Sequence, residues 1–261
     1  MEKLDFLVDY LMRESKEVSI DKLPKNKENK EKLWRSLCNI RNTKEISDYY
    51  LKIESEYLQD ELQNRTITNI EDIKPLFNNK ICLWKGDITT LKIDSIVNAA
   101  NSQGLGCFIP CHKCIDNQIH TFAGINLRLE CKEKMNEIGI LKNGKAFITK
   151  AYNLPSKCII HTVGPIIYSN VTNKEIKELK QCYINSMELA KENSIKTIAF
   201  PCISTGEFGF PKKEASRIAI EAVQCYLEEN KDYFDKIVFN VFSDEDYDIY
   251  FKNLGEKYGR W

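Results

Sequence analysis

From residue 79 onwards, short apolar runs alternate with longer amphipathic segments. The runs that predict strands are Ile81–Trp84, Ser95–Val97, Ala146–Ile148, Cys158–Ile160, Thr197–Phe200 and Ile237–Phe242. Residues at helical spacing predict the helices between them, one with Ile176, Leu179, Tyr183 and Met187, another with Ala215, Ile218, Ala222 and Cys225. Such alternation predicts a three-layer α/β domain with a largely buried sheet, whose ligands are expected where loops leave the carboxyl ends of the strands.

The first 75 residues have a different character, since they are rich in Leu, Glu, Lys and Tyr and contain no glycine. Leu4, Leu7 and Leu11 share one helical face, and apolar residues within 46–57 share another. The charged run between them, over residues 25–32, predicts a solvated loop or the start of a helix. We therefore predict a helical extension over residues 1–75 that docks on the α/β domain of residues 76–261.

The overall composition excludes some classes of protein. Lys and Arg number 38, as do Asp and Glu, so the formal net charge is zero, which disfavours a broadly basic nucleic-acid-binding protein. No apolar run approaches the ~20 residues that a membrane-spanning helix needs. The N-terminus alternates charged and apolar residues, unlike a signal peptide. We therefore expect a cytoplasmic protein with neither nucleic acid nor a membrane as a partner.

The chain has ten cysteines, which in a protein without a secretory signal are expected to be reduced thiols. Seven are scattered through the chain, most of them in apolar segments, and are predicted to be small core residues: Cys38, Cys82, Cys131, Cys158, Cys182, Cys202 and Cys225. The remaining three gather with a histidine in one short loop, which points to a different role for them.

In that loop, Cys107, His112 and Cys114 form a soft ligand set with the spacing C-x4-H-x-C. Two thiolates and an imidazole favour zinc over magnesium or calcium. A structural zinc site usually has four protein ligands, whereas three ligands and an open position are typical of a catalytic one, which we predict here. The alternatives are Cys111 as a fourth ligand, a disulfide, or unliganded reactive thiols. His120 is predicted to be a structural helix residue rather than a ligand.

Polar side chains follow the first two predicted strands. Asp87 can accept a hydrogen bond from a ligand amino group, although capping a turn is the commoner role of such an aspartate. The amides of Asn98 and Asn101 suit ribose hydroxyls, which need both donors and acceptors. Asp116 and Asn117 are predicted to cap the helix that follows them, and a second role of Asp116 as a base stays open.

The segment Ser204–Pro211 connects a predicted strand to the helix around Ala215. Its two glycines, Gly206 and Gly209, allow the backbone to approach a ligand and to point successive N–H groups at one anion. The N-terminus of the following helix adds a favourable dipole. The pattern suits a pyrophosphate in a protein without net charge; the alternative is a tight connection that merely needs glycine.

In order and spacing, these motifs resemble the macrodomain family. The resemblance spans residues 75–255 and is carried by Gly86–Thr89, Asp94–Asn101, Ile160–Pro165 and Ser204–Pro211. Where most macrodomains have a glycine run after the equivalent of Asn101, this chain has Gly106–Cys114 followed by Asp116–His120. That pattern looks like the zinc-dependent branch of the family, the protein-ADP-ribose hydrolases associated with sirtuin operons, whose N-terminal helical extension the chain also resembles.

The resemblance implies a three-layer αβα macrodomain sandwich with a mixed sheet, and a hydrolase that removes mono-ADP-ribose from protein side chains with Zn²⁺ as cofactor. It implies an O-linked modification of an acidic or hydroxyl side chain, attached by a sirtuin-type ADP-ribosyltransferase, and a lipoylated carrier protein among the modified partners. The alternative is a non-catalytic reader module that binds ADP-ribose and whose zinc is structural.

For the nucleotide, the resemblance implies that Asp87 accepts from the adenine amino group beside the Ile88 backbone and that Phe242 packs on the adenine face. It implies that one loop presents its backbone N–H groups to the diphosphate: Ser204, Thr205, Gly206, Glu207 and Phe208. Phe208 is also expected to pack against the distal ribose.

For the reacting end, the resemblance implies that Asn101 holds a distal ribose hydroxyl and that Asn98 supports the loop. Zinc is expected beside the scissile bond at three ligands: Cys107, His112 and Cys114. Asn101 and Asp116 are the predicted catalytic residues, with Asp116 as a base or water-orienting group.

Overall fold

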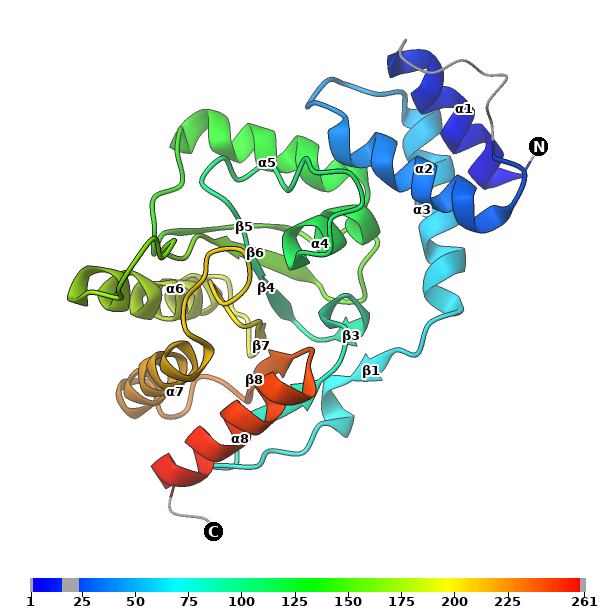
Figure 1. Cartoon of the computed structure of the whole chain (residues 1–261). Coiled ribbons are helices and arrows are strands. Elements are labelled where there is room, and N and C mark those ends of the chain that lie inside the picture. Colours follow the sequence, from blue (N-terminus) through cyan, green and yellow to red (C-terminus); the bar gives the residue numbers. More distant parts are fainter. Residues whose placement is uncertain (1, 16–23, 259–261) are drawn as a thin grey trace.

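The computed structural model of this chain describes residues 2–15 and 24–258. Within these residues the chain forms a group of N-terminal helices followed by an α/β domain (Figure 1). The N-terminal helices are α1 (Lys3–Ser15), α2 (Lys27–Ile40) and α3 (Asp48–Gln63). The charged run at 25–32 is therefore the start of a helix, which Asn26 caps by accepting a hydrogen bond from the N–H of Asn29.

A mixed sheet forms the centre of the α/β domain. Its strands are β2 (Ile81–Lys85), β4 (Ser95–Ala99), β5 (Ala146–Lys150), β6 (Cys158–Thr162), β7 (Thr197–Phe200) and β8 (Lys236–Val241). They lie in the order β2-β8-β7-β4-β6-β5, and every neighbouring pair is parallel except β5 with β6. Because the parallel strands run in one direction, their carboxyl ends and the loops that follow them meet at one edge of the sheet.

Helices cover both faces of this sheet (Figure 1). Three of them share one apolar cluster with the sheet: α6 (Asn173–Glu192), α7 (Lys212–Glu229) and α8 (Asp244–Tyr258). The opposite face packs against α4 (Ile115–Ala123) and α5 (Ile125–Ile138) in a second cluster. The predicted three-layer α/β fold with a mixed sheet is therefore confirmed.

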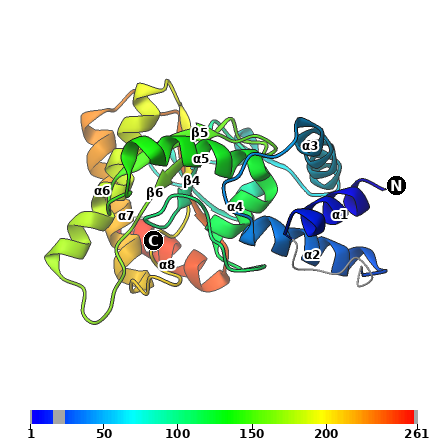
Figure 2. The ribbon, with the colours of Figure 1, turned by 90° about the horizontal axis from the view of Figure 1, so that it is seen from above.

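The N-terminal helices have a core of their own. It includes Leu7 of α1, Trp34 of α2 and Tyr50 of α3, together with Ile125 at the start of α5. Figure 2 shows the three helices beside α4 and α5. The extension therefore packs against one helical layer of the α/β domain rather than standing apart from it.

Buried polar and charged side chains tie the extension to that layer. The carboxylate of Glu54, in α3, accepts a hydrogen bond of 2.9 Å from the backbone N–H of Ile125. Arg128 of α5 donates to three backbone carbonyls at the end of α2: Cys38, Asn39 and Arg41. Because a buried charge without partners destabilises a protein by several kcal/mol, these contacts make each part depend on the other.

Two sequence expectations are wrong in part, namely the extent of the helical extension and the burial of the scattered cysteines. The helical prediction is wrong for residues 64–75, where β1 (Thr68–Asn69) pairs with β3 (Leu91–Lys92) and a 3-10 turn follows. The β-branched residues of Thr66–Thr68 favour an extended backbone, which explains the change. Cys225 is exposed on α7 rather than in the core, and two other scattered cysteines, Cys158 and Cys202, are only half-buried.

None of the helices in the described residues combines the length and apolar character needed to cross a bilayer.

Candidate functional site

The predicted site residues gather at the carboxyl-terminal edge of the sheet. Asp87 follows β2, Asn101 follows β4, the segment 204–208 follows β7, and Phe242 follows β8 directly. These strands are parallel, so their loops meet although more than 150 residues separate the first from the last. The fold thus places the sequence motifs around one region.

A buried polar network lies at the end of β4. The Nδ2 of Asn98 donates to Oδ1 of Asp116 at 2.7 Å and lies 3.1 Å from Nδ1 of His161. The other ring nitrogen of His161 lies 2.9 Å from the hydroxyl of Thr149. Burial lowers the pKa of His161 to about 3, so the ring is neutral and can accept from Asn98. Asn98 is itself fully buried, and its amide links Asp116 of α4 to His161 of β6.

Asp116 lies behind Asn101. Its Oδ2 is 3.4 Å from the amide nitrogen of Asn101, which also donates to the carbonyl of Gly106 at 3.1 Å. Burial raises the pKa of Asp116 to about 6, although the hydrogen bond from Asn98 opposes that change. Only 4% of the surface of Asp116 is exposed, so the carboxylate fixes the Asn101 amide from within.

The capping role predicted for Asp116 and Asn117 is wrong. The N-cap of α4 is Cys114, whose Sγ accepts a hydrogen bond of 3.4 Å from the N–H of Asn117. Asp116 lies inside the first turn, where its side chain turns inward to Asn98. Since sulfur is a weak acceptor, the sequence preference for Asp or Asn caps pointed to the wrong residues.

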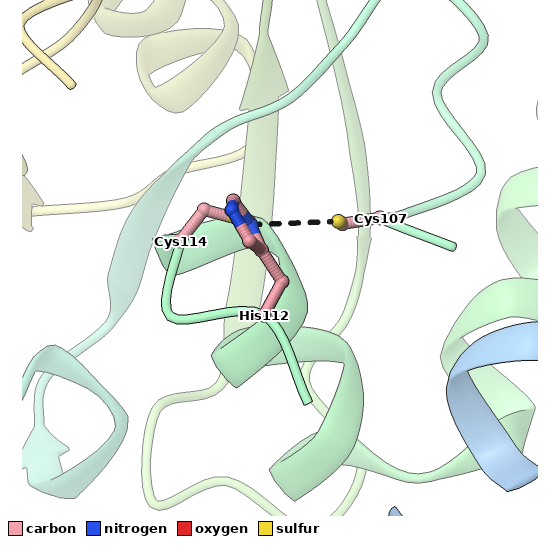
Figure 3. A group of neighbouring side chains, drawn as sticks. All are labelled: Cys107, His112 and Cys114. Atoms are coloured by element: carbon pink, nitrogen blue, oxygen red, sulfur yellow. Dashed lines mark hydrogen bonds between the residues drawn. The ribbon is translucent and has the colours of Figure 1, made fainter. Parts of the chain in front are cut away.

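The three predicted zinc ligands converge (Figure 3). The ligand atoms of Cys107, His112 and Cys114 all lie within 4.8 Å of one another, and the Cys107 Sγ is 3.7 Å from the His112 Nδ1. Zinc bonds of about 2.3 Å to sulfur and about 2.0 Å to nitrogen, at a tetrahedral angle, would put these atoms about 3.5 Å apart. The donor set and its spacing therefore fit a zinc ion.

Other thiols and histidines stay outside this group. The Sγ of Cys111 turns to the backbone carbonyl of Lys32 at 3.3 Å, and all ten cysteines are free thiols. His120 belongs to a different, fully buried group with Cys131 and His161. Because the nitrogens of His161 already have partners, that second group does not offer an evident metal site. The arrangement thus favours neither the four-ligand nor the disulfide alternative.

The electrostatics of the group suit a cation. Burial is the largest cause that raises the pKa of Cys114 to about 12, and the neighbouring Cys107 contributes to the same change, so the Cys114 thiol ionises at neutral pH only beside a compensating positive charge. The Nε2 of His112 lies 3.6 Å from the carboxylate of Glu207. A carboxylate on the second ring nitrogen orients a metal-binding histidine, and here it also joins residues 107–114, the proposed metal loop, to the segment 204–208.

The segment after β7 is shaped mainly by its own backbone. The N–H of Phe210 donates to the carbonyl of Ser204 and that of Gly209 to Gly206, each at 2.9 Å. Ser204 has a φ of 65°, a conformation that costs free energy for a residue with a Cβ and recurs at functional sites. A Cβ added at Gly206 would meet no atom within 4 Å, so this backbone faces open space. Such a turn before the N-terminus of α7 suits an anion.

At the other end of the site, Asp87 has two partners. One carboxylate oxygen accepts from the N–H and hydroxyl of Thr89, so the residue caps a 3-10 turn over Ile88–Thr90. The other oxygen accepts from Arg65 at 2.5 Å. Arg65 was not predicted, because its position 22 residues before Asp87, just after α3, carries no local motif.

Phe242 directly follows β8. Its aromatic ring is 80% exposed and is free to stack on a ligand.

Comparison with known proteins identifies the chain's relatives. Residues 97–219 match the Macro domain family. A protein of Treponema medium called Protein-ADP-ribose hydrolase is 45% identical over 255 residues, which cover 96% of this chain and 97% of that protein. The chain belongs to the macrodomain family. Because the match leaves out only 4% of this macrodomain protein, it takes in most of the helical extension as well.

Solved structures of macrodomains are also similar to this chain. The Trypanosoma brucei macrodomain in complex with ADP-ribose has a TM-score of 0.67 and 28% identity, covering 84% of this macrodomain protein and 95% of that chain. The Oceanobacillus iheyensis macrodomain with ADP has a TM-score of 0.64 and 36% identity, covering 72% and 97%. Both of these structures hold an adenine nucleotide or its ribosyl derivative.

Proposed function

We propose that this macrodomain protein is a zinc-dependent hydrolase that removes mono-ADP-ribose from modified protein side chains. The observation that carries the proposal is the contact between the metal loop and the segment after β7, where His112 lies 3.6 Å from Glu207. In this proposal the zinc ion and the diphosphate of the substrate therefore bind on either side of this contact. The relative named Protein-ADP-ribose hydrolase, at 45% identity, supports the same activity.

In this proposal the chain holds the ADP-ribose along the edge of the sheet. Asp87 keeps lone pairs beyond its contacts with Thr89 and Arg65, and accepts from the adenine amino group beside Ile88. The exposed ring of Phe242 packs on the adenine face. The backbone N–H groups of residues 204–208 bind the diphosphate, and Phe208 packs against the distal ribose.

At the reacting end, Asn101 binds a distal ribose hydroxyl and Asp116 holds the Asn101 amide in place. A water oxygen forms the new bond to C1″, the bond from C1″ to the side-chain oxygen breaks, and the carboxylate or hydroxyl side chain leaves with the electron pair. With a pKa near 6, Asp116 is mostly ionised at neutral pH and is the group we propose to take the proton of that water.

Cys107, His112 and Cys114 would hold the zinc ion beside this bond. Zinc bound there would polarise a ribose or leaving-group oxygen. The two thiolates offset the charge of the ion, which favours positioning of the substrate over formation of a free hydroxide. Asn101 and the turn at residues 204–208 fix the ribose against that oxygen, so the reacting atoms meet in one geometry.

The substrate in this proposal is an O-linked mono-ADP-ribose on an acidic or hydroxyl side chain, attached by a sirtuin-type transferase. A lipoylated carrier protein is the proposed modified partner. Because all ten cysteines are free thiols, we propose that the protein works in the reducing cytoplasm.

The test is hydrolysis of a protein mono-ADP-ribosylated on an acidic residue, with and without a zinc chelator, with the metal content determined on the same sample. We expect release of ADP-ribose that the chelator abolishes, and about one zinc ion per chain. Binding of ADP-ribose without any release, from ester-linked and hydroxyl-linked substrates alike, would instead establish a reader module.

A further inference from the structure

The metal loop, residues 107–114, is held by side chains of a distant helix. Nη2 of Arg35, in α2, donates to the carbonyl of His112 at 2.7 Å. Nε and Nη2 of the same guanidinium donate to Oδ1 of Asn117 at 3.2 and 2.7 Å. Arg35 is 77 residues from His112 in sequence, so the extension supplies a contact that the loop cannot make for itself.

Asn117 in turn contacts both predicted thiol ligands. Its side chain is fully buried, and its Nδ2 donates to the carbonyl of Ile109 at 3.0 Å and to that of Cys107 at 3.5 Å. Its backbone N–H donates to the Sγ of Cys114. Because Arg35 occupies Oδ1 of this amide, it sets which way Nδ2 points. One guanidinium therefore contacts His112 directly and Cys107 through the Asn117 amide, while the backbone of Asn117 contacts Cys114.

Asn39, one helical turn after Arg35, holds the middle of the loop. Its Oδ1 accepts from the backbone N–H of Cys111 at 2.8 Å, and its Nδ2 donates to the hydroxyl of Thr121 at 3.4 Å. Cys111 has a φ of 53°, a left-handed conformation that is unfavourable without such support. The residue that follows this turn is the ligand His112.

We infer that Arg35 and Asn39 are positioning residues for the metal site, an inference that rests on the zinc site of the proposed function. The helix that carries them is itself fixed, since Trp34 and Leu37 pack in the core of the extension. The extension is then a part of the metal site rather than only a covering layer. Partners that orient metal ligands from outside typically change metal affinity by roughly 10–100-fold, which is the effect expected here.

The experiment compares Arg35→Ala and Arg35→Lys with wild type and with Lys30→Ala. Lys30 is a matched control, because it is a half-buried cation of the same helix whose ion pair is with Asp5 rather than with the loop. Zinc affinity is measured by competition with a chromogenic chelator. Cobalt is then loaded into the full chain, and its absorption bands report the ligand geometry independently of turnover.

We expect Arg35→Ala to weaken zinc binding by roughly 10–100-fold and to weaken or shift the cobalt bands, with Lys30→Ala like wild type. Arg35→Lys is expected to restore little, because an ammonium cannot replace a planar fork that bonds two acceptors. If circular dichroism shows that Arg35→Ala is unfolded, Arg35→Lys and Asn39→Ala decide the question.

Equal zinc affinity and equal cobalt spectra in Arg35→Ala, Asn39→Ala and wild type would overturn the inference. So would an equal loss in Lys30→Ala, since the effect would then come from a loosened extension. A wild-type protein that binds neither zinc nor cobalt through its thiols would contradict the proposed zinc site itself. The two failures are therefore distinguishable.

Discussion

The metal loop and the segment 204–208 face each other but keep their shapes in different ways. The segment after β7 is closed by hydrogen bonds within its own backbone, as between Phe210 and Ser204. The metal loop instead receives hydrogen bonds from α2, through Arg35 and Asn39. One loop belongs to the α/β domain alone, whereas the other needs the extension.

This difference implies that the binding of the diphosphate and the binding of the metal depend on different parts of the molecule. If the self-supporting turn binds the diphosphate and the externally supported loop binds the metal, changes in one should leave the other intact. The contact between His112 and Glu207 is the point where the two tasks meet. The largest test of the comparison is therefore to remove a ligand from the metal loop and to ask whether nucleotide binding survives.

Cys114→Ala should have the largest effect. It removes a predicted zinc ligand, so we expect loss of bound zinc and a fall in hydrolysis of at least roughly 100-fold. Affinity for ADP-ribose, measured by calorimetry, should stay within a few-fold of wild type. Because Cys114 also caps α4, Cys114→Ser is the matched variant, since its hydroxyl can still cap while binding zinc poorly. Full turnover by a zinc-free variant would show that the metal is not catalytic.

Gly206→Val should weaken ADP-ribose binding and leave zinc binding intact, the reverse of Cys114→Ala. A Cβ at residue 206 meets no atom within 4 Å, so the branched side chain projects into the space of the ligand without disturbing the fold. We expect ADP-ribose binding to weaken by at least about tenfold, a loss of ~1.4 kcal/mol, while bound zinc stays at the wild-type level. Calorimetry and metal analysis on one sample check both halves, with Gly206→Ala as a graded intermediate. Normal binding would mean that the diphosphate lies elsewhere.

The same contrast explains what could be predicted from the sequence. The strands could be predicted because apolar runs such as Ile159–Ile160 lie between turn residues, and the turn after β7 because Gly206 and Gly209 are only three residues apart in the chain. The grouping of Cys107, His112 and Cys114 could be predicted for the same reason, since eight consecutive residues contain all three. Features that are formed by residues close together in the chain can therefore be predicted from the sequence.

What the sequence did not reveal depends on distant contacts. Arg35 and Arg65 look like ordinary polar residues of a helical extension, and their acceptors lie 77 and 22 residues away. Asp116 was assigned to a cap because Asp often caps helices, but Asn98 of strand β4 turns its side chain inward. Such contacts follow from tertiary packing, which overrides local preference.

The smallest expected effect concerns the junction that holds the extension. Glu54 is buried, which raises its pKa from the usual 4.5 to about 7 in the folded protein. Between these two values the folded state keeps a proton that the unfolded state has lost. The free energy of unfolding therefore falls as pH rises from about 4.5 to about 7 and levels off above, a change on the order of a few kcal/mol.

Glu54→Gln should remove this part of the pH dependence, because the amide cannot ionise and its oxygen can still accept from the N–H of Ile125. The measurement is urea unfolding between pH 5 and 8, with Glu56→Gln, on an exposed part of the same helix, as the matched control. The difference between Glu54→Gln and wild type isolates this carboxyl from the buried histidines. An unchanged pH slope would mean that Glu54 is ionised throughout. Because Glu54 holds the start of α5 and not the metal loop, zinc affinity should stay within about twofold of wild type. Such a result would separate the junction at Glu54 from the contacts that α2 makes with the metal loop through Arg35 and Asn39.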